Sequence, residues 1–544
     1  MIRVTRFIPA LILILITSSS LPAQAPASKC TGSNNVNYAM YLTSQPKDRS
    51  DCHVTVSGGN VSFGAGVTNP AMSCPDAFAW KLLADSVNQE FWTNWATDDQ
   101  TWPGQPYKPC TGAAGSDCCD LNSVTQNPAN CPFFPGAART ASSAPKIRTG
   151  VPPSKTHMPV GTSPMQMQTL MAALGTTDPD RAIRQSMTEV VFRNEPMLGY
   201  VRSNNLYNTQ GVVAVFNNVN GNIRPGAPYR LASTPGRLSE IDFPTTSIMI
   251  KSDWIVAKYA PLFGIKENPA HPFIKMTINS ATDPVTGKPI AAECWLLGVH
   301  FSSKDIPNWV WTTFEHVDNP GRCDYIGCND SFGFTTPDKV AAGQATNFTA
   351  PKTSCDNLIT PGFVYDLGKG YAGGTITAEL QTLLNGLHVG DGPVISHTTV
   401  PMIMPNAHDP AWRSYRLKGS QTEFTDSVGR AGILGNSITE AGFVQTSSCI
   451  SCHARSSTNA TGTVPLPLGV FINETNETGY LQSHRGIPNS EWYNASAQPP
   501  SQITLQTDFV WGFLAASAIY DPTKPTLQAT PKPKSPRDII RENH

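Results

Sequence analysis

Five consecutive residues in the C-terminal part of the chain, Cys449-Ile450-Ser451-Cys452-His453, combine two thiols and an imidazole at a functional spacing. Two cysteines three residues apart lie on one face of a helical turn, so both thiols can form thioethers to one porphyrin. The histidine lies four residues after the first cysteine on that face, where its ring can ligate an iron atom. The motif therefore predicts one covalent haem c, attached through Cys449 and Cys452, with His453 as a ligand of the iron.

Other chemistries of two close cysteines fit the sequence less well. A zinc site needs further ligands at close spacing, and the chain contains no second Cys-x-x-Cys. A thioredoxin-like redox pair is expected near a βαβ pattern, which the flanking sequence lacks. A disulfide that happens to precede a histidine is the remaining alternative.

The N-terminus has the features of a secretory signal. Arg3 and Arg6 precede a short apolar run at 7–16, and the small residues Ala23 and Ala25 form a cleavage pattern. We therefore expect a signal peptide over residues 1–25 and an exported, periplasmic protein. The apolar run is too short for a permanent membrane anchor, and attachment of haem to this motif also takes place outside the cytoplasm.

The composition narrows the class of protein. The chain has 544 residues, of which only 15% are charged, below the usual quarter, while glycine and proline are abundant. This favours a β-rich protein with long loops. A net charge of −1 argues against nucleic acid or an anionic membrane as a partner.

Cysteines outside the motif suggest a disulfide framework. The chain has thirteen cysteines, and eleven remain after the motif is subtracted, an odd number. At least one thiol is therefore left unpaired or pairs outside the chain. Because most precede residue 132, we expect disulfides to tie the N-terminal region. The eleven are Cys30, Cys52, Cys74, Cys110, Cys118, Cys119, Cys131, Cys294, Cys323, Cys328 and Cys355.

Hydrophobic periodicity predicts a mixed α+β fold. Apolar residues recur at helical spacing over 75–91 and in pieces over 165–205, and a further helix is expected at 380–387. A turn is expected at 204–208. Four tryptophans before residue 103 favour a core rather than a sugar-binding surface. Strands are predicted at 212–216, 248–256, 273–278, 295–301, 309–316 and 412–417.

These elements suggest five segments. Residues 1–25 are the signal peptide, 26–150 a cysteine-rich, disulfide-tied N-terminal region, and 151–425 a β-rich central domain resembling an antiparallel sandwich. Residues 426–520 form a small helical haem region, and 521–544 a disordered tail. In the haem region, the capping box Ser437-x-x-Glu440 predicts a helix running toward the cysteines. Thr507 and Asp508 are expected to cap a second helix at 509–520.

The residues around the motif carry a resemblance to a known family. The segment 447–454, Ser-Ser-Cys-Ile-Ser-Cys-His-Ala, resembles c-type cytochromes. Together with the segments 508–511 (Asp-Phe-Val-Trp) and 309–316 (Trp-Val-Trp-Thr-Thr-Phe-Glu-His), it is similar to a poorly characterised family of large secreted bacterial mono-haem proteins. The resemblance implies covalent haem through Cys449 and Cys452 with His453 as proximal ligand. It implies no particular substrate.

The second axial ligand of the iron is left open by the sequence. Small cytochromes c usually supply a methionine from beyond the motif, whereas here every methionine lies at or before Met404. The distal ligand could be a histidine after the motif, a residue of the upstream region, or absent. The candidates are His484 downstream and His316, His300, His397, His408, Met402 and Met404 upstream.

These alternatives lead to different functions. With two strong ligands the iron mainly passes electrons, which predicts a periplasmic mono-haem cytochrome exchanging single electrons with a redox partner protein or a small molecule. An open position would favour a haem enzyme, peroxidase-like or acting on a small molecule. A third possibility is a secreted ligand-binding protein with a structural or sensory haem.

Overall fold

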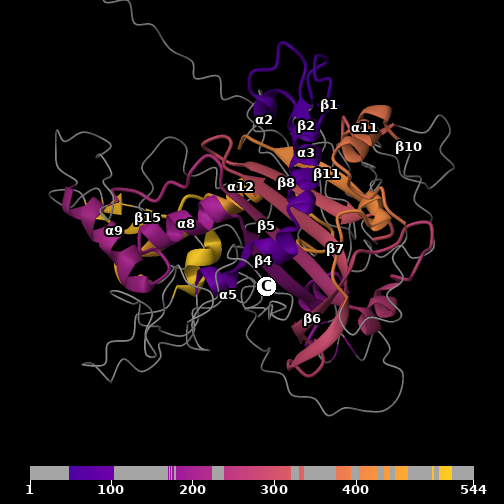
Figure 1. Cartoon of the computed structure of the whole chain (residues 1–544). Coiled ribbons are helices and arrows are strands. Elements are labelled where there is room, and N and C mark those ends of the chain that lie inside the picture. The colour runs from indigo at the N-terminus through magenta and orange to yellow at the C-terminus, as the bar shows by residue number, and fades with distance from the viewer. Residues whose placement is uncertain are drawn as a thin grey trace, which may run out of the picture.

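A single antiparallel sheet of seven strands forms the centre of the computed structural model (Figure 1). The order is β11-β8-β7-β5-β4-β3, and β6 pairs with β7 beside the end of β8. The strands are β3 (Ala96–Thr97), β4 (Met187–Arg193), β5 (Ile248–Val256), β6 (Lys275–Thr282), β7 (Pro289–Ser303), β8 (Val310–His316) and β11 (Tyr415–Gln421). The structure describes residues 48–102, 170, 172, 174–176, 179–222, 238–319, 330–335, 375–393, 403–424, 434–441, 447–462, 493–494 and 501–516.

Helices pack around this sheet and short two-stranded ladders lie at its margins. The helices are α2 (Pro70–Ser73), α3 (Pro75–Asn88), α4 (Phe91–Asn94), α5 (Asp98–Thr101), α7 (Pro179–Ser186), α8 (Glu195–Ser203), α9 (Thr209–Asn222), α11 (Ala378–Gly386) and α12 (Cys449–His453), with 3-10 turns η1 (Ala257–Phe263), η3 (Pro410–Ser414) and η6 (Trp511–Ala515). The ladders are β1 (Thr55–Ser57) with β2 (Asn60–Ser62), β9 (Phe334–Thr335) with β10 (Thr375–Ile376), β12 (Ser457–Asn459) with β15 (Thr504–Gln506), and β13 (Tyr493–Asn494) with β14 (Ser501–Gln502).

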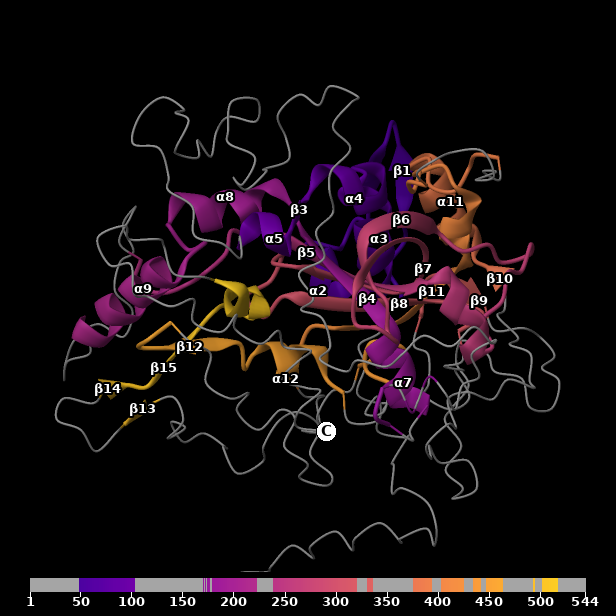
Figure 2. The same cartoon turned by 90° about the horizontal axis from the view of Figure 1, so that it is seen from below.

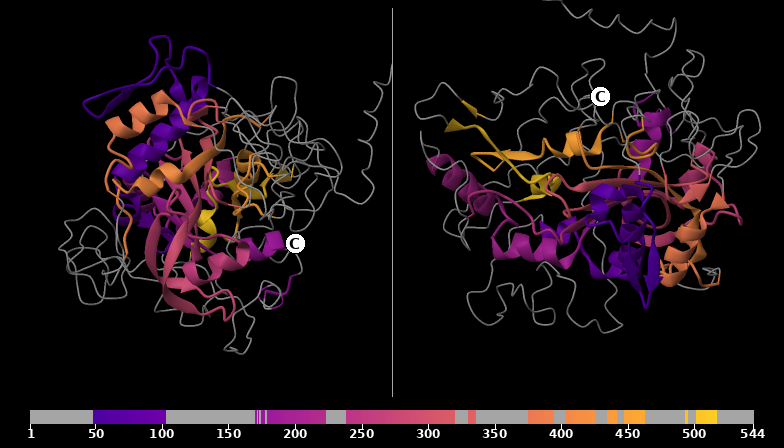
Figure 3. Two further views of the ribbon diagram at one scale, coloured as in Figure 1. Left: turned by 90° about the vertical axis from the view of Figure 1, so that its right-hand side faces the viewer. Right: turned by 90° about the horizontal axis from the view of Figure 1, so that it is seen from above.

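The two faces of the sheet are covered by different parts of the chain. Helices α3 and α4 lie on one face, and α12 with the β12–β15 ladder lies on the other (Figures 2 and 3). Side chains alternate between the faces along each strand, so adjacent residues enter different environments. Phe192, Ile250 and Phe301 are cross-strand neighbours and belong to the main hydrophobic core beneath α3. We call this side the apolar face.

Segments from the N-terminal and central parts of the sequence share that core. Leu83 of α3 packs in one cluster with Ile250 and Phe301, and Trp80 contacts Phe314 edge-on at 4.9 Å between ring centroids. Strand β3 extends the same sheet by pairing with β4. A second cluster, which includes Trp102, Met249, Trp311 and Ile450, lies on the side of α12. Predicted core tryptophans Trp80, Trp92, Trp95 and Trp102 are all buried.

One disulfide, Cys52–Cys74, is present in the described part of the chain. Its Cα atoms are 5.7 Å apart, and Cys74 immediately precedes α3, so the bond ties the segment before β1 to the start of that helix. Within the described residues, Cys294, Cys449 and Cys452 are unpaired. The other eight cysteines lie outside the described residues. The disulfide bonds expected among them therefore stay a prediction.

Most predicted elements are confirmed, with shifts of a few residues. The strand at 248–256 and the turn near Asn205 form as expected, and the strands at 273–278, 295–301 and 309–316 correspond to β6, β7 and β8. The helices predicted at 75–91 and 380–387 are α3 and α11. The mixed α and β class and the antiparallel pairing are thus confirmed.

Two predicted elements are wrong, and a third is shifted along the chain. Residues 212–216 are helical within α9, because Val212, Val215 and Phe216 recur at helical spacing and bury one face in the second cluster. Residues 187–191 form strand β4 rather than a helix, since both of its neighbours supply backbone partners. The 412–417 strand begins only at Tyr415, after the 3-10 turn η3.

The two helices predicted in the haem region also take other forms. Residues 437–441 make a turn, and its side-chain cap is Asn436 rather than Ser437: Asn436 Oδ1 accepts from the Ile438 N–H at 2.9 Å. Beyond Thr507 the chain makes a tight turn and then η6, whereas residues 517–520 and the predicted tail lie outside the described residues. In the described part of the chain, no helix is both long and apolar enough to cross a membrane.

Candidate functional site

The Cys-x-x-Cys-His motif forms the short helix α12 on the second face of the sheet. Ser448 caps it, with its hydroxyl accepting from the Ser451 N–H at 3.4 Å. Gln421, the last residue of β11, holds the same turn from the sheet: its Nε2 donates to Ser448 Oγ at 3.1 Å and its Oε1 accepts from the Ile450 N–H at 3.1 Å. The edge strand therefore fixes the position of the motif.

The two thiols of the motif are unpaired and differ in exposure. Cys449 is buried, with its Sγ 3.5 Å from the carbonyl oxygen of Leu434, and Cys452 is partly exposed. Burial raises the pKa of Cys449 well above the ordinary thiol value. Burial also raises the pKa of Cys452 to about 12, although Lys251 acts in the opposite direction. Both groups are therefore neutral thiols at physiological pH.

His453 is held in one tautomer by a backbone carbonyl. Its Nδ1 lies 2.8 Å from the carbonyl oxygen of Phe509. A carbonyl oxygen can only accept, so Nδ1 must carry the hydrogen and Nε2 keeps its lone pair. The ring packs against Trp311 of β8 at 4.3 Å between centroids. Burial lowers the pKa of His453 to about 4, so the imidazole is neutral, as metal ligation requires.

A short ladder brings Phe509 to His453 across more than fifty residues of sequence. Strand β12 follows α12 almost directly, and β15 runs antiparallel to it, pairing Ser457 with Gln506. Beyond the ladder the Thr507 N–H donates to the Ser456 carbonyl at 3.0 Å, and the next two residues turn back toward α12. The register of this pairing therefore determines which carbonyl meets the imidazole.

Buried polar atoms without partners accumulate next to the motif. In the described part of the chain, the indole Nε1 of Trp511 and the hydroxyls of Ser456, Ser457 and Thr458 are buried and make no hydrogen bond of normal geometry. Trp511 is close enough to Cys452 to lower the pKa of its thiol. Unsatisfied buried polar groups are uncommon in folded proteins, and their presence here marks a place where a bound group could accept or donate hydrogen bonds. Two unpaired thiols, a neutral imidazole and these polar groups thus lie together around α12.

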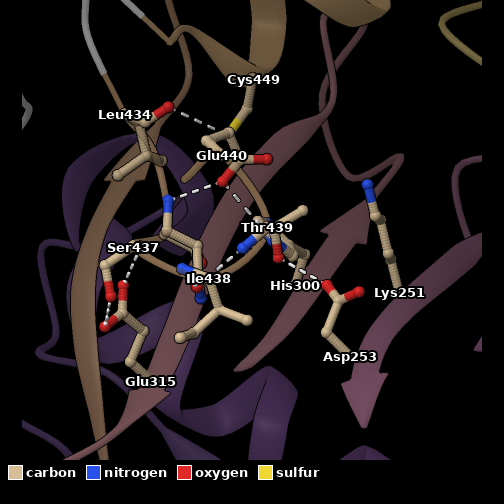
Figure 4. Close-up of polar contacts among 12 residues, drawn as sticks. Lys251, Asp253, His300, Glu315, Leu434, Ser437, Ile438, Thr439, Glu440 and Cys449 are labelled. Atoms are coloured by element: carbon tan, nitrogen blue, oxygen red, sulfur yellow. Dashed lines mark hydrogen bonds and ion pairs between the residues drawn. The ribbon is translucent and has the colours of Figure 1, made fainter. Parts of the chain in front are cut away.

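Beneath the motif, the second face of the sheet is lined by charged and polar side chains (Figure 4). Two cross-strand rows carry them, one containing Lys251, His300 and Thr313 and the other Glu189, Asp253 and Glu315. Four residues of the segment before α12 pack onto them. We call the ten residues the polar layer: Glu189, Lys251, Asp253, His300, Thr313, Glu315, Asn436, Ser437, Thr439 and Glu440.

Hydrogen bonds connect the two sides of the polar layer. Thr439 bridges it, because its Oγ1 donates to Asp253 Oδ2 at 2.5 Å and accepts from His300 Nε2 at 2.9 Å (Figure 4). Ser437 donates to the Glu315 carboxylate through both its N–H and its hydroxyl, the latter at 2.7 Å. The segment that leads into the motif is thus bonded to three strands of the sheet.

One glycine makes this contact possible. Gly298 lies in the row of Asp253 and Glu315, directly under Asn436. A Cβ atom at this position would lie 2.7 Å from Asn436 Nδ2, closer than carbon atoms approach nitrogen. The amide of Asn436 uses the space to donate to Thr313 Oγ1 at 3.1 Å and to the Phe314 carbonyl at 3.0 Å.

Burial and neighbouring charges shift the pKa values of residues in the polar layer, some upward and some downward. Burial raises the pKa of Glu440 to about 8, although Lys251 partly opposes this. Burial disfavours the charged form of Lys251, but Glu189 at 3.1 Å, Asp253 and Glu440 outweigh it and raise the pKa of the ammonium. The pKa of His300 is held well below its usual range by burial and by Lys251. Near neutral pH the layer holds a neutral His300 and a positive Lys251.

The structure separates the candidates for a distal ligand. His300 lies in the polar layer, near enough to His453 for its charge to act on the pKa of His300. His316 stacks on Phe273 at 3.6 Å between centroids, and His408 pairs with Asp391 at 2.7 Å on the surface, so each already has a different partner. Met404 packs against the main core. His484, His397 and Met402 lie outside the described residues.

Several contributors to the site were not singled out from the sequence. Lys251 and Asp253 lie two residues apart in β5, on one side of the strand, which is also the pattern of a strand with one solvent-facing side. The carbonyl of Phe509 has no side-chain signature. Trp311 did appear within the aromatic segment 309–316, and its contact with His453 gives that segment a role.

Comparisons with known proteins provide no relative. No family model matches the chain, and neither a curated protein nor a solved structure is similar to it. Among the described residues, no group of three or more histidine, cysteine, aspartate or glutamate side chains is arranged to hold a metal ion.

Proposed function

We propose that the protein is an exported mono-haem cytochrome c, which carries haem covalently on Cys449 and Cys452 and transfers single electrons. The observation that carries the proposal is the hydrogen bond from His453 Nδ1 to the Phe509 carbonyl at 2.8 Å. Histidines that ligate metals commonly donate their other ring N–H to a carbonyl or carboxylate, which fixes the ring and raises its basicity. Here that bond leaves Nε2 available to iron.

The surroundings of α12 support the same role. Covalent attachment of haem needs two reduced thiols on one helical turn beside the iron ligand. The helix α12 contains all three groups. Trp311, Ile450 and Phe509 belong to one apolar cluster that would exclude water from a bound porphyrin. The buried hydroxyls of Ser456, Ser457 and Thr458, which make no hydrogen bond, would be available to its polar groups.

When bound, haem would supply a one-electron redox couple. The chain would hold it through Cys449 and Cys452, orient the proximal imidazole of His453, and shield the group within a cytochrome c-like region packed on the β-rich part. The electrons would be exchanged with a redox partner protein or a small-molecule donor or acceptor. The periplasm is the proposed location, because the N-terminal sequence has the pattern of a signal peptide and this haem attachment is extracytoplasmic.

Haem attachment is tested first by replacing the motif cysteines. We expect the exported wild-type protein to carry one haem that survives acid–acetone extraction and gives the thioether-type pyridine haemochrome spectrum. Cys449→Ser with Cys452→Ser should abolish covalent haem. Cys294→Ala is the matched control, because Cys294 is also an unpaired, buried thiol but lies in β7, and it should retain haem. A wild-type protein without covalent haem, or a double variant that keeps it, would disprove the proposal.

A haem enzyme with an open distal position is a second candidate. The observation that favours it is that, among the described candidates, His316, His408 and Met404 are occupied elsewhere and His300 is bonded to Thr439. A Soret band that moves with carbon monoxide or peroxide would support this candidate. A low-spin spectrum unaffected by carbon monoxide would support electron transfer.

A further inference from the structure

The turn that presents the Phe509 carbonyl to His453 has an unusual backbone. Residues 507–510 form a tight turn in which the Val510 N–H donates to the Thr507 carbonyl at 3.0 Å. Its two central residues, Asp508 and Phe509, have φ of 48° and 66°. Turns with two positive φ angles normally use asparagine, aspartate or glycine at these positions. A phenylalanine there is strained and persists only when its surroundings impose the conformation.

The Asp508 carboxylate supplies that constraint. It is buried and accepts three hydrogen bonds from different parts of the chain. Lys304 Nζ donates to Oδ1 at 2.6 Å, the Phe243 N–H donates to Oδ2 at 2.7 Å, and Trp309 Nε1 donates to Oδ1 at 3.3 Å. Lys304 is itself buried and donates to the Pro307 carbonyl at 3.2 Å. Asp508 is therefore fixed to the loop between β7 and β8.

The same turn is fixed on its other side by packing. The ring of Phe509 lies 6.0 Å from Trp311 between centroids, and Trp311 in turn contacts His453. The Thr507 hydroxyl donates to the Val510 carbonyl at 2.9 Å. Strain at Phe509 is thus located at the peptide group whose oxygen accepts from His453, and a buried ion pair next to it holds that peptide in place.

We propose that Asp508 is the positioning residue for the proximal histidine: through Lys304, Phe243 and Trp309 it holds the left-handed turn that directs the Phe509 carbonyl at His453 Nδ1. This inference rests on the proposed function, because it assigns His453 to the iron. The bond fixes the plane of the imidazole and strengthens its donation to iron, which favours the ferric state. The hydrogen bonds of Asp508 are made with Lys304, Phe243 and Trp309, so it acts on His453 through the backbone of the turn.

Two substitutions separate the carboxylate from the backbone requirement. Asp508→Gly keeps positive φ accessible and removes the anchor. Asp508→Asn keeps a residue that tolerates positive φ and an acceptor for the Phe243 N–H, but removes the charge that pairs with Lys304. Asp283→Asn is the matched control: Asp283 is also buried and paired with a lysine, Lys258 at 2.9 Å, but lies in the turn between β6 and β7, at the opposite end of the sheet.

The readouts are the midpoint potential and the protection of the His453 Nδ1 hydrogen from exchange, measured by NMR in the reduced holoprotein. For Asp508→Gly we expect the equilibrium constant for reduction to rise about tenfold, a positive shift of about 59 mV, with faster exchange. Asp508→Asn should shift both in the same direction by less. Asp283→Asn should lower thermal stability and leave both readouts unchanged.

Failure of this inference and failure of the proposed function give different results. Should the wild type bind haem and both Asp508 variants keep its potential and exchange rate, the positioning role is overturned. If the Asp508→Gly protein does not fold and accumulate, the potential and exchange rate of Asp508→Asn alone test the positioning role. If the wild type lacks haem, the proposed function fails, and the inference is judged on the haem-free full chain by ¹⁵N NMR. Wild-type His453 should then be the Nδ1–H tautomer and the glycine variant a mixture; identical tautomers would overturn it.

Discussion

Neighbouring residues of β7 enter two different environments: Phe301 lies among aromatic rings on the apolar face, whereas His300 lies in the polar layer. Phe301 contacts Phe91 at 6.2 Å and Phe314 at 5.7 Å between centroids, with no polar group to satisfy. His300 is also buried, but it is bonded to Thr439 and lies 3.9 Å from the Glu440 carboxylate. One face gains stability from burial of apolar area, and the other buries charges that must be paired.

The contrast between apolar packing and paired polar groups suggests that the two faces of the sheet have different roles. Apolar packing tolerates small displacements, whereas hydrogen bonds across the polar layer fix the segment 434–441 relative to three strands. That segment precedes α12 in the sequence, and under the proposed function the two thiols and the imidazole of α12 have to match one porphyrin in geometry. We infer that the apolar face sustains the fold and that the polar layer sets the position of the motif.

The largest expected effect comes from the apolar face. Phe301→Ala should reduce the free energy of unfolding by about 3–5 kcal/mol, because it leaves a cavity lined by apolar side chains, which water does not fill favourably. Urea unfolding followed by tryptophan fluorescence measures it. The adjacent substitution His300→Ala should cost less, about 1–3 kcal/mol, since it mainly removes one of the two hydrogen bonds of the Thr439 hydroxyl, which keeps its bond to Asp253. Equal costs for the two variants would contradict the division between the faces.

The sequence predicts the apolar face well. Strand β5 was located to the residue because it is rich in β-branched and aromatic residues, and α3 was located by helical periodicity. These signals are local, and burial on the apolar face follows from them. Within the candidate site, the sequence signal for the motif at Cys449–His453 was also local. The structure forms the motif as one helix.

The polar layer could not be predicted in the same way, because each of its contacts joins distant segments. Lys251 and Asp253 have the pattern of a solvent-facing strand side, and nothing in β5 indicates that residues 434–441 cover them. The capping-box interpretation of Ser437 and Glu440 failed because Asn436 takes the capping position and Ser437 is bonded to Glu315 instead. A tertiary contact thus overrides a local signature.

Glu440 provides the second test, through the pH dependence of stability. Its pKa is raised to about 8 by burial, so the folded protein binds a proton more tightly than the unfolded chain. Its contribution is therefore complete below the ordinary value of 4.5 and is lost as the pH rises toward about 8. Glu440→Gln cannot ionise and should become more stable than the wild type by about 2–3 kcal/mol at pH 9.

The measurement is the difference in unfolding free energy between wild type and Glu440→Gln from pH 5 to pH 9. Asp283→Asn is the control with the opposite sign. Although burial opposes it, hydrogen bonds from Lys258 and neighbouring donors lower the pKa of Asp283. The stability that the ionised Asp283 gives the wild type is therefore fully present at a pH above 3.8, the ordinary pKa of the group. It is lost only at more acid pH. If the difference in unfolding free energy between wild type and Glu440→Gln did not change with pH, the Glu440 carboxyl would not have a raised pKa in the folded protein. Its proposed place in the electrostatics of the polar layer would then be wrong.

Gly298 offers the smallest and most local test of the comparison. Gly298→Ala places a methyl group against the Asn436 amide and should cost about 1–3 kcal/mol, because the tightly bonded amide can move only by giving up its contacts with Thr313 and Phe314. In an Asn436→Ala background the methyl group has room, so the same substitution should cost less. This non-additivity in a double-mutant cycle identifies the contact itself.

Gly199 in α8 is the matched control for that cycle. A Cβ atom there would meet only the Glu195 side chain at 3.6 Å, an ordinary contact, so Gly199→Ala should be neutral or stabilise by about 0.5–1 kcal/mol through helix propensity. If Gly298→Ala also raised the reduction potential or lowered covalent haem content while Gly199→Ala did not, the polar layer would be shown to position the motif. Additive costs at Gly298 and Asn436 would instead mean that the segment 434–441 rests on the sheet without being fixed by it.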